Sequence, residues 1–258
     1  MALPVFIVGA QRAGTSFLAS SLQSIPGVAR TVVKKPEPRL LMRESWQDKQ
    51  QFNGAFAAGS VGWEVTHLLE KSTSYLEFPV VAERIQHLSP DAHVIIILRN
   101  PLRRALSHYN FSVAHGLEKL NLQRSLEMDA AGEMRSPEGE LSVNPFTYLS
   151  RGRYERFLPH WIETIPHSQL SLLIFEDVIS KFWNPAAFLT KVGFSSDQQS
   201  FFAPSPQPSW NSGEDKNPWE ENADMLYSYA PYFGPTLNFL QTQGLETATW
   251  SEISTLNS

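Results

Sequence analysis

Three short apolar runs constrain the fold of this chain more than any other feature of its sequence. They cover residues 5–8, 94–98 and 170–175, and each is rich in β-branched or aromatic residues. Each run is too short for a buried helix, and its near-continuous apolarity is typical of a strand covered on both faces of a parallel sheet. Weaker candidates at residues 61–65 and 28–33 bring the expected sheet to four or five strands.

Helical patterns lie between these runs. Apolar residues recur at spacings of three and four after Gly14, after Asn100 and across residues 154–162. Asn100 suits the N-cap of its helix, and Pro101 suits the first turn. The alternation of strands and helices predicts βαβ units, and therefore an α/β fold with a doubly wound, mostly parallel sheet and flanking helices.

The length of 258 residues is near the upper end for a chain with one hydrophobic core. We therefore expect a single domain over residues 1–258. Two polar stretches, about residues 118–144 and 202–222, interrupt the strand–helix pattern. We expect both to be long loop excursions, of a kind that often covers an active site.

Charge and composition disfavour several classes of protein. The chain has 21 basic and 26 acidic residues, and this net charge of −5 disfavours a nucleic acid as partner. It has no cysteine, which excludes disulfides and thiolate chemistry. No apolar run approaches the roughly 20 residues that cross a bilayer, and the first residues lack the charged region of a signal peptide. We expect a cytoplasmic protein with neither a membrane nor a nucleic acid as its partner.

The first apolar run leads into a loop at residues 9–16, Gly-Ala-Gln-Arg-Ala-Gly-Thr-Ser, and then into a helix. Such a junction directs several backbone N–H groups and the positive helix end at one point, which suits a phosphate or a sulfate. A nucleotide P-loop has lysine directly after its second glycine. Here Thr15 follows Gly14, and the cation, Arg12, lies earlier. The loop therefore favours a sulfuryl group over a γ-phosphoryl group, which normally needs a metal; a P-loop kinase or nucleotide hydrolase stays the alternative.

A second anion site is indicated at the end of the second apolar run. Arg99 follows that run directly, at the strand end where ligands gather in open α/β sheets. Ser107 comes eight residues later, two turns into the next helix. An N-capped helix with solvated arginines is the plain alternative.

Both segments resemble parts of the sulfotransferases that use 3′-phosphoadenosine 5′-phosphosulfate. Residues 9–16 resemble the family's 5′-phosphosulfate loop, with Arg12 in the position that usually holds lysine. Residues 99–107 resemble its 3′-phosphate site, an Arg-x-Pro turn followed by serine eight residues after the arginine. Residues 70–75, Glu-Lys-Ser-Thr-Ser-Tyr, resemble the Glu-Lys-(Ser/Thr)-Pro-x-Tyr segment of the heparan-type and bacterial branches but lack its proline. The resemblance covers roughly residues 4–250.

The resemblance implies the P-loop-like sulfotransferase fold and a sulfuryl donor, 3′-phosphoadenosine 5′-phosphosulfate, which is released as adenosine 3′,5′-bisphosphate. The residues that it implies for binding this cofactor are Arg12, Ala13, Gly14, Thr15, Ser16, Arg99 and Ser107. A non-catalytic protein that only binds the nucleotide is a further alternative.

Sulfuryl transfer needs positioning, charge stabilisation and removal of the acceptor proton. The resemblance implies that Arg12 and Lys71 hold the donor's oxygens as charge moves onto the departing phosphate. It implies Glu37 as the base, because residues 36–41, Pro-Glu-Pro-Arg-Leu-Leu, are similar to the family's Lys-Glu-Pro-(His/Arg)-Phe-Phe stretch. His67 is the rival base, since the cytosolic steroid and phenol branch uses histidine. A rigid surface turn at Glu37 is the structural alternative.

The sequence also departs from the family pattern. The family often has a basic glycine-containing loop over the 3′-phosphate, but residues 210–217 here read Trp-Asn-Ser-Gly-Glu-Asp-Lys-Asn, in which Lys216 and Asn211 are the candidate replacements. No histidine-rich spacing accompanies Glu176 and Asp177, so we expect no metal site. The acceptor is expected to be a small molecule, a specialised metabolite with a hydroxyl or an amine. The sequence does not indicate an oligomeric state.

Overall fold

The computed structural model describes residues 2–32, 37–56, 63–137, 144–203, 218–250 and 253. They belong to two compact units. The first consists of Met1–Leu98 and Phe157–Pro208, and the second of Arg99–Arg156 and Ser209–Ser258. The single domain over residues 1–258 stays a prediction. Among the described residues, no helix is both long and apolar enough to cross a membrane.

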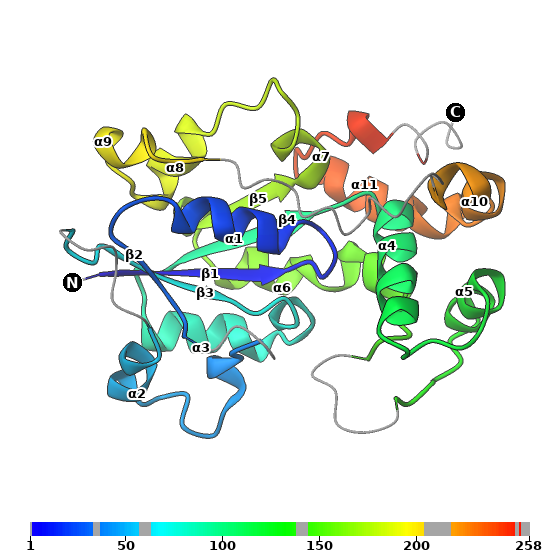
Figure 1. Cartoon of the computed structure of the whole chain (residues 1–258), viewed down its shortest axis with the longest axis horizontal. Helices are drawn as coiled ribbons and strands as arrows, with labels where there is room; N and C mark the ends of the chain where they lie inside the picture. Colours follow the sequence, from blue (N-terminus) through cyan, green and yellow to red (C-terminus); the bar gives the residue numbers. More distant parts are fainter. Residues whose placement is uncertain are drawn as a thin grey trace. The chain divides into compact units, whose positions relative to one another are not determined.

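The first unit contains a five-stranded sheet in which all neighbouring strands are parallel (Figure 1). In sheet order, the strands are β2 (Val28–Arg30), β3 (His67–Lys71), β1 (Leu3–Gly9), β4 (His93–Leu98) and β5 (Leu170–Ile174). The predicted α/β class and the expected strand number are confirmed. Because all the strands run the same way, their carboxyl ends share one edge of the sheet.

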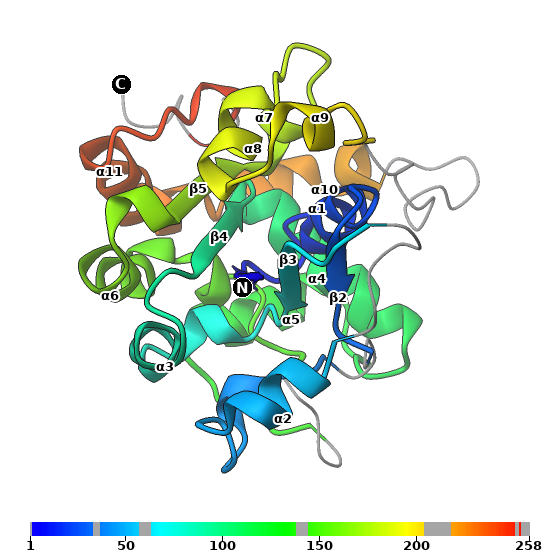
Figure 2. The same cartoon turned by 90° about the vertical axis from the view of Figure 1, so that its left-hand side faces the viewer.

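Helices cover both faces of this sheet: α1 and α8 lie on one side, α3 and α6 on the other (Figures 1 and 2). Successive side chains of a strand point to opposite faces. Accordingly, Val5 and Ile7 of β1 pack in one apolar cluster with residues of α1 and α8, whereas Phe6 packs against Phe52 of α2. The helices of this unit are α1 (Thr15–Gln23), α2 (Lys49–Gly54), α3 (Val80–Leu88), α6 (Leu158–Thr164), α7 (Phe175–Val178), α8 (Ala186–Val192) and α9 (Ser196–Gln199).

The strand expected at residues 61–65 lies elsewhere. Residues 57–62 are outside the described part of the chain, and β3 begins only at His67, which pairs with Leu3 at the start of β1. The sequence of β3, His-Leu-Leu-Glu-Lys, is half polar. A search for apolar runs misses such a strand, because three of its five residues are polar.

The second unit contains α4 (Pro101–Ala114), α5 (Leu122–Ala130), α10 (Pro218–Tyr227) and α11 (Gly234–Thr242). Asn100 caps α4 as predicted, and its side chain accepts hydrogen bonds from the N–H groups of Leu102 and Arg103. The excursion at residues 118–144 is not wholly a loop, because it contains α5. Most of the excursion at residues 202–222 lies outside the described residues.

The helix expected across residues 154–162 is divided. Tyr154–Arg156 form a 3-10 turn, and α6 begins only at Leu158. Pro159 explains the division, because it has no N–H to donate to the carbonyl four residues earlier and so fits only the first turn of a helix.

Candidate functional site

The loop between β1 and α1 depends on its two glycines. A Cβ atom on Gly9 would lie 2.7 Å from the Cβ of Leu76, and one on Gly14 would lie 2.2 Å from the ring of Phe175. Gly14 also has a φ of 83°, and Arg12 has a φ of 67°, a left-handed conformation that is uncommon outside glycine. Such conformations cluster at functional sites. The loop therefore has the tight geometry that the sequence predicted.

The predicted donor-binding residues of this loop differ in exposure. Ala13 and Thr15 are buried, Arg12 and Gly14 are half-buried, and Ser16 is exposed. Gly14 holds the N-cap position of α1 and makes no side-chain cap hydrogen bond there. The first N–H groups of a helix need partners from outside it. Both features suit an anion at this point.

The loop and Lys71 lie at the same edge of the sheet. Lys71 is the last residue of β3 and pairs with Ile7 of the neighbouring strand β1, two residues before the loop starts at Gly9. The N–H of Ser72 then donates to the carbonyl of Ile7. This edge, formed by the carboxyl ends of the strands, is where open α/β sheets bind ligands.

Glu37 is bound to the end of β3 although it lies far away in the sequence. Its Oε1 accepts hydrogen bonds from Lys71 Nζ at 3.2 Å and from Thr73 Oγ1 at 2.6 Å. Its Oε2 accepts a longer one, 3.4 Å, from the N–H of Ser74. The structure therefore brings together Glu37 and Lys71, two of the residues predicted to be catalytic. Nothing in the sequence indicated the Thr73 contact beyond the absence of the expected proline at that position.

A second carboxyl group, that of Glu70, fixes the backbone just after Glu37. Its Oε1 accepts hydrogen bonds from Tyr75 Oη at 2.6 Å, Ser72 Oγ at 3.0 Å and Leu40 N at 3.2 Å. The same two hydroxyls in turn accept from backbone N–H groups: Ser72 from residue 39, and Tyr75 from residue 41. Burial raises the pKa of Glu70 to about 7, although its three donors and the charge of Arg43 act in the opposite direction.

His67 does not join this group. It begins β3, whereas Lys71 ends it, so that their Cα atoms are about 13 Å apart along the strand. Its ring is buried and stacked on Phe194 with centroids 4.0 Å apart, and Nδ1 lies 2.8 Å from Thr66 Oγ1. Burial lowers the pKa of His67, which favours the neutral ring. The place of His67 is that of a packed core residue, and the rival base is not supported.

The predicted 3′-phosphate residues belong to the second unit. Arg99 directly follows the last residue of β4, and Tyr154 Oη donates a hydrogen bond of 2.8 Å to its carbonyl. Ser107 lies within α4 and is buried. Lys216 and Asn211, the candidate replacements for the basic loop, are outside the described residues. Across the part of the chain that is described, no group of three or more His, Asp or Glu side chains could hold a metal ion.

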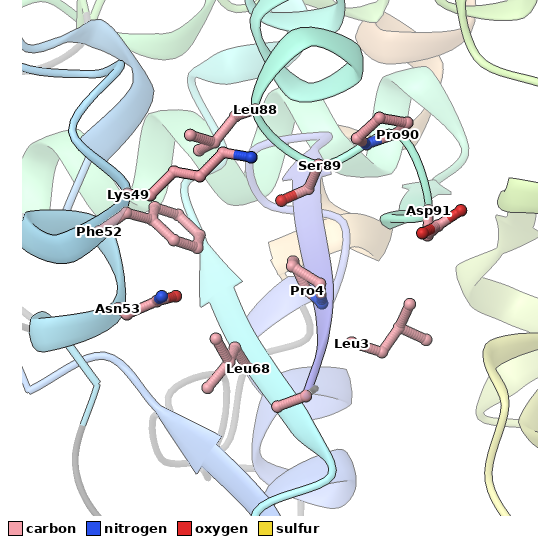
Figure 3. A pocket seen from close by; sticks show the side chains of 11 residues that line it. Leu3, Pro4, Lys49, Phe52, Asn53, Leu68, Leu88, Ser89, Pro90 and Asp91 are labelled. Atoms are coloured by element: carbon pink, nitrogen blue, oxygen red, sulfur yellow. The ribbon is translucent and has the colours of Figure 1, made fainter.

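The described part of the first unit has at least two hollows. The larger, about 570 Å³, opens near the start of β1 and is lined by Leu3, Phe52, Leu68 and neighbouring residues (Figure 3). It lies at the amino end of the sheet, away from the edge where ligands gather. The smaller, about 340 Å³, is lined mainly by apolar groups with Arg43 and Gln51, and it includes Pro38, the neighbour of Glu37. Its position makes the smaller hollow the better candidate for an acceptor.

Comparisons with known proteins identify the family of the chain. The family model described as "Sulfotransferase domain" matches residues 3–184. The chain is 28% identical over 180 residues to the bifunctional heparan sulfate N-deacetylase/N-sulfotransferase 1 of Caenorhabditis elegans, covering 67% of this chain and 19% of the relative. It is 27% identical over 202 residues to the bifunctional heparan sulfate N-deacetylase/N-sulfotransferase 2 of Homo sapiens. This match covers 74% of this chain and 21% of the relative. The chain thus spans about a fifth of the length of these curated relatives.

A solved structure shows the same fold. The crystal structure of a sulfotransferase from Alicyclobacillus acidocaldarius superposes with a TM-score of 0.68 at 22% sequence identity. The superposition covers 97% of this chain and all of the other.

Proposed function

We propose that this chain, which belongs to the sulfotransferase family, transfers the sulfuryl group of 3′-phosphoadenosine 5′-phosphosulfate to a hydroxyl or an amine of a small molecule. The chain is an enzyme that transfers sulfate, and the identity of donor and acceptor is the part proposed. The observation that carries the proposal is the Glu37 carboxylate, bound to Lys71 and Thr73 at the sheet edge from which the Arg12 loop also leaves.

The hydrogen-bond donors of the protein at this edge fit an anionic phosphosulfate. Arg12 and Lys71 are cations, Thr15 and Ser16 carry hydroxyls, and the start of α1 offers backbone N–H groups without a side-chain cap. All of these groups donate hydrogen bonds, and hydrogen bonds between ionised partners are the strong ones. We assign the 5′-phosphosulfate to these residues together with Ala13 and Gly14, and the 3′-phosphate to Arg99 and Ser107.

When bound, the donor supplies a sulfuryl group on a phosphate leaving group. The acceptor's oxygen or nitrogen forms the new bond to sulfur, and the bond from sulfur to the bridging oxygen breaks with its electron pair going to the phosphate. Arg12 and Lys71 stabilise the charge that arrives on that phosphate. Glu37 takes the proton from the acceptor. Oε2 is the atom that takes it, because Oε1 already accepts from Lys71 and Thr73.

The size of the hollow beside Pro38 supports a small acceptor. Its volume of about 340 Å³ is within the range of small-molecule sites. Heparan sulfate is named for the curated relatives, which are about five times longer than the matched region. This volume supports a small molecule; a specialised metabolite is the acceptor that we propose, and a heparan-type sugar is the second candidate.

A transfer assay tests the proposal. The enzyme is incubated with a donor labelled with radioactive sulfur and three acceptor sets: small hydroxyl compounds, small amines and heparan-type oligosaccharides. Label is expected on members of the first two sets. Label on the oligosaccharides alone would overturn the small-molecule acceptor, and a protein that neither binds nor consumes the donor would overturn the choice of donor.

A further inference from the structure

The short contact between Thr73 and Glu37 assigns a task to Thr73 that the proposed function does not require. Thr73 Oγ1 donates to Glu37 Oε1 at 2.6 Å, whereas Lys71 Nζ is 3.2 Å from the same oxygen. The segment of the heparan-type and bacterial branches that residues 70–75 resemble has proline at this position, and proline carries no hydroxyl. This contact is therefore a property of this chain rather than of the segment in general.

The two side chains that bind Glu37 Oε1 differ in how firmly they can orient the carboxylate. Thr73 is buried and β-branched, so its side chain is stiff at χ1 and its hydroxyl has a fixed place. Lys71 carries a compact charge on a flexible four-carbon stem. Thr73 is thus the partner that can set the direction of the carboxylate, while Lys71 contributes charge.

The proposed function requires Lys71 to bind the sulfuryl donor as well as Glu37. Its ammonium group has to reach the donor's oxygens, and it also pairs with Glu37 Oε1 at 3.2 Å. If the ammonium turns to the donor, the carboxylate loses one of the two hydrogen bonds on Oε1. Thr73 and the N–H of Ser74 then remain to hold it.

We propose that Thr73 is a positioning residue, which keeps the Glu37 carboxylate aimed with Oε2 towards the acceptor while Lys71 serves the donor. The proposal rests on the proposed function, because it needs Glu37 as the base. A displacement of about 1 Å at a reacting group can reduce turnover about a hundredfold. Loss of the Thr73 hydroxyl is therefore expected to affect turnover and not donor binding.

The chain offers a matched control for this contact. Thr236 is also buried and donates to a carboxylate, Glu155 Oε2, at 2.5 Å, but it belongs to the second unit and to no proposed site. Thr73→Val and Thr236→Val therefore remove the same kind of hydrogen bond. Thr73→Ser keeps the hydroxyl and removes only a methyl group.

The experiment measures turnover with the acceptor found by the transfer assay, affinity for adenosine 3′,5′-bisphosphate by calorimetry, and crystal structures of wild type and Thr73→Val with that bisphosphate. Thr73→Val is expected to lower kcat about tenfold to a hundredfold, to keep the affinity within about twofold, and to show the Glu37 carboxylate turned away. Thr73→Ser should restore most of kcat, and Thr236→Val should leave kcat unchanged.

Full turnover and an unmoved carboxylate in Thr73→Val would overturn the proposal, and the crystal structures decide this even without an acceptor. Glu37→Gln in the same series distinguishes a failure of Glu37 as the base from a failure of Thr73 as the positioning residue. An active Glu37→Gln enzyme would overturn the base itself. An inactive Glu37→Gln enzyme beside a fully active Thr73→Val enzyme would overturn only the role of Thr73.

Discussion

Glu37 in the first unit and Glu118 in the second each accept several hydrogen bonds. Only in Glu118 do both oxygens accept short ones. Arg135 binds Glu118 through two parallel hydrogen bonds, of 2.6 and 2.7 Å, one to each oxygen. Tyr148 Oη donates to the same carboxylate at 2.7 Å, and two backbone N–H groups donate at 2.8 and 2.9 Å. Glu37 instead has one oxygen with only a 3.4 Å contact.

The two carboxylates also differ in their exposure to solvent. The Glu118 side chain has no solvent exposure, whereas 16% of the Glu37 side chain is exposed. Burial acts to raise the pKa of Glu118, but the hydrogen bonds from Arg135 and the other donors outweigh it and lower the pKa to about 2. A carboxylate saturated in this way cannot take up a proton near neutral pH. Glu37 differs in its geometry, because its Oε2 has only the long contact to the N–H of Ser74 and its side chain is partly exposed.

Glu70 is the intermediate case. It is fully buried, its three donors all address one oxygen, and among the described residues its Oε2 has no hydrogen-bond partner. Burial therefore dominates and raises its pKa to about 7. The number of hydrogen-bond donors alone does not decide the direction of the pKa shift. The distribution of the donors over the two oxygens and direct contact with a cation decide it.

Replacing Glu37 and Glu118 in turn by glutamine tests whether the first carboxylate is reactive and the second structural. Glu37→Gln is expected to reduce kcat by about 10²–10⁴-fold, because the proton acceptor is removed, and to leave thermal stability nearly unchanged. Steady-state rates with the labelled donor and a melting curve measure both. A Glu37→Gln enzyme with wild-type kcat would show that Glu37 is not the base.

Glu118→Gln should show the reverse pattern. Removing one partner of a buried ion pair costs about 3–5 kcal/mol of unfolding free energy, and the partial exposure of Arg135 places the expectation at the lower end, about 3 kcal/mol. Urea unfolding measures it. Glu127→Gln is the control, because Glu127 is 42% exposed and lies 3.6 Å from Arg124 in a surface pair expected to contribute at most about 0.5 kcal/mol. Equal losses in both variants would contradict a structural role for Glu118.

The pH dependence of stability should separate Glu70 from Glu118. Glu70 has a folded pKa of about 7 against an ordinary value of 4.5, so between these values the unfolded chain binds fewer protons and stability falls as pH rises. The stabilisation is complete below 4.5 and is lost by about pH 7. For Glu118 the folded pKa of about 2 lies below 4.5, so its stabilisation is present above pH 4.5 and is lost as pH falls towards 2.

Urea unfolding of wild type and Glu70→Gln at pH 4.5 and 7.5 checks the Glu70 part. The difference between the two proteins should shift in favour of Glu70→Gln by about 2–3 kcal/mol over this interval. A difference that does not vary with pH would mean that Glu70 is ionised throughout.

The sequence predicted the parts of this site that local pattern determines. The run into Gly9, the loop with Arg12 and the helix from Thr15 are continuous in the chain, and the cap at Asn100 is a local feature. The half-polar strand β3 escaped the search for apolar runs.

The contacts that the sequence could not predict join distant residues. Thr73 meets Glu37 across 36 positions, and Arg135 meets Glu118 within a stretch whose polarity indicated a loop. Tertiary folding pairs such polar residues with each other, and a single sequence does not show which pairs form.

The most direct test of the proposed sulfuryl donor compares adenosine 3′,5′-bisphosphate without metal with ATP and magnesium in a thermal-shift measurement. At about a hundredfold its dissociation constant, the bisphosphate should stabilise the protein by about 2.7 kcal/mol, or roughly 5–10 °C. Arg12→Ala and Arg99→Ala should weaken the binding by about 1.5–3 kcal/mol, and the control Arg124→Ala should not. A shift with ATP and magnesium alone, unaffected by these substitutions, would contradict the proposed donor.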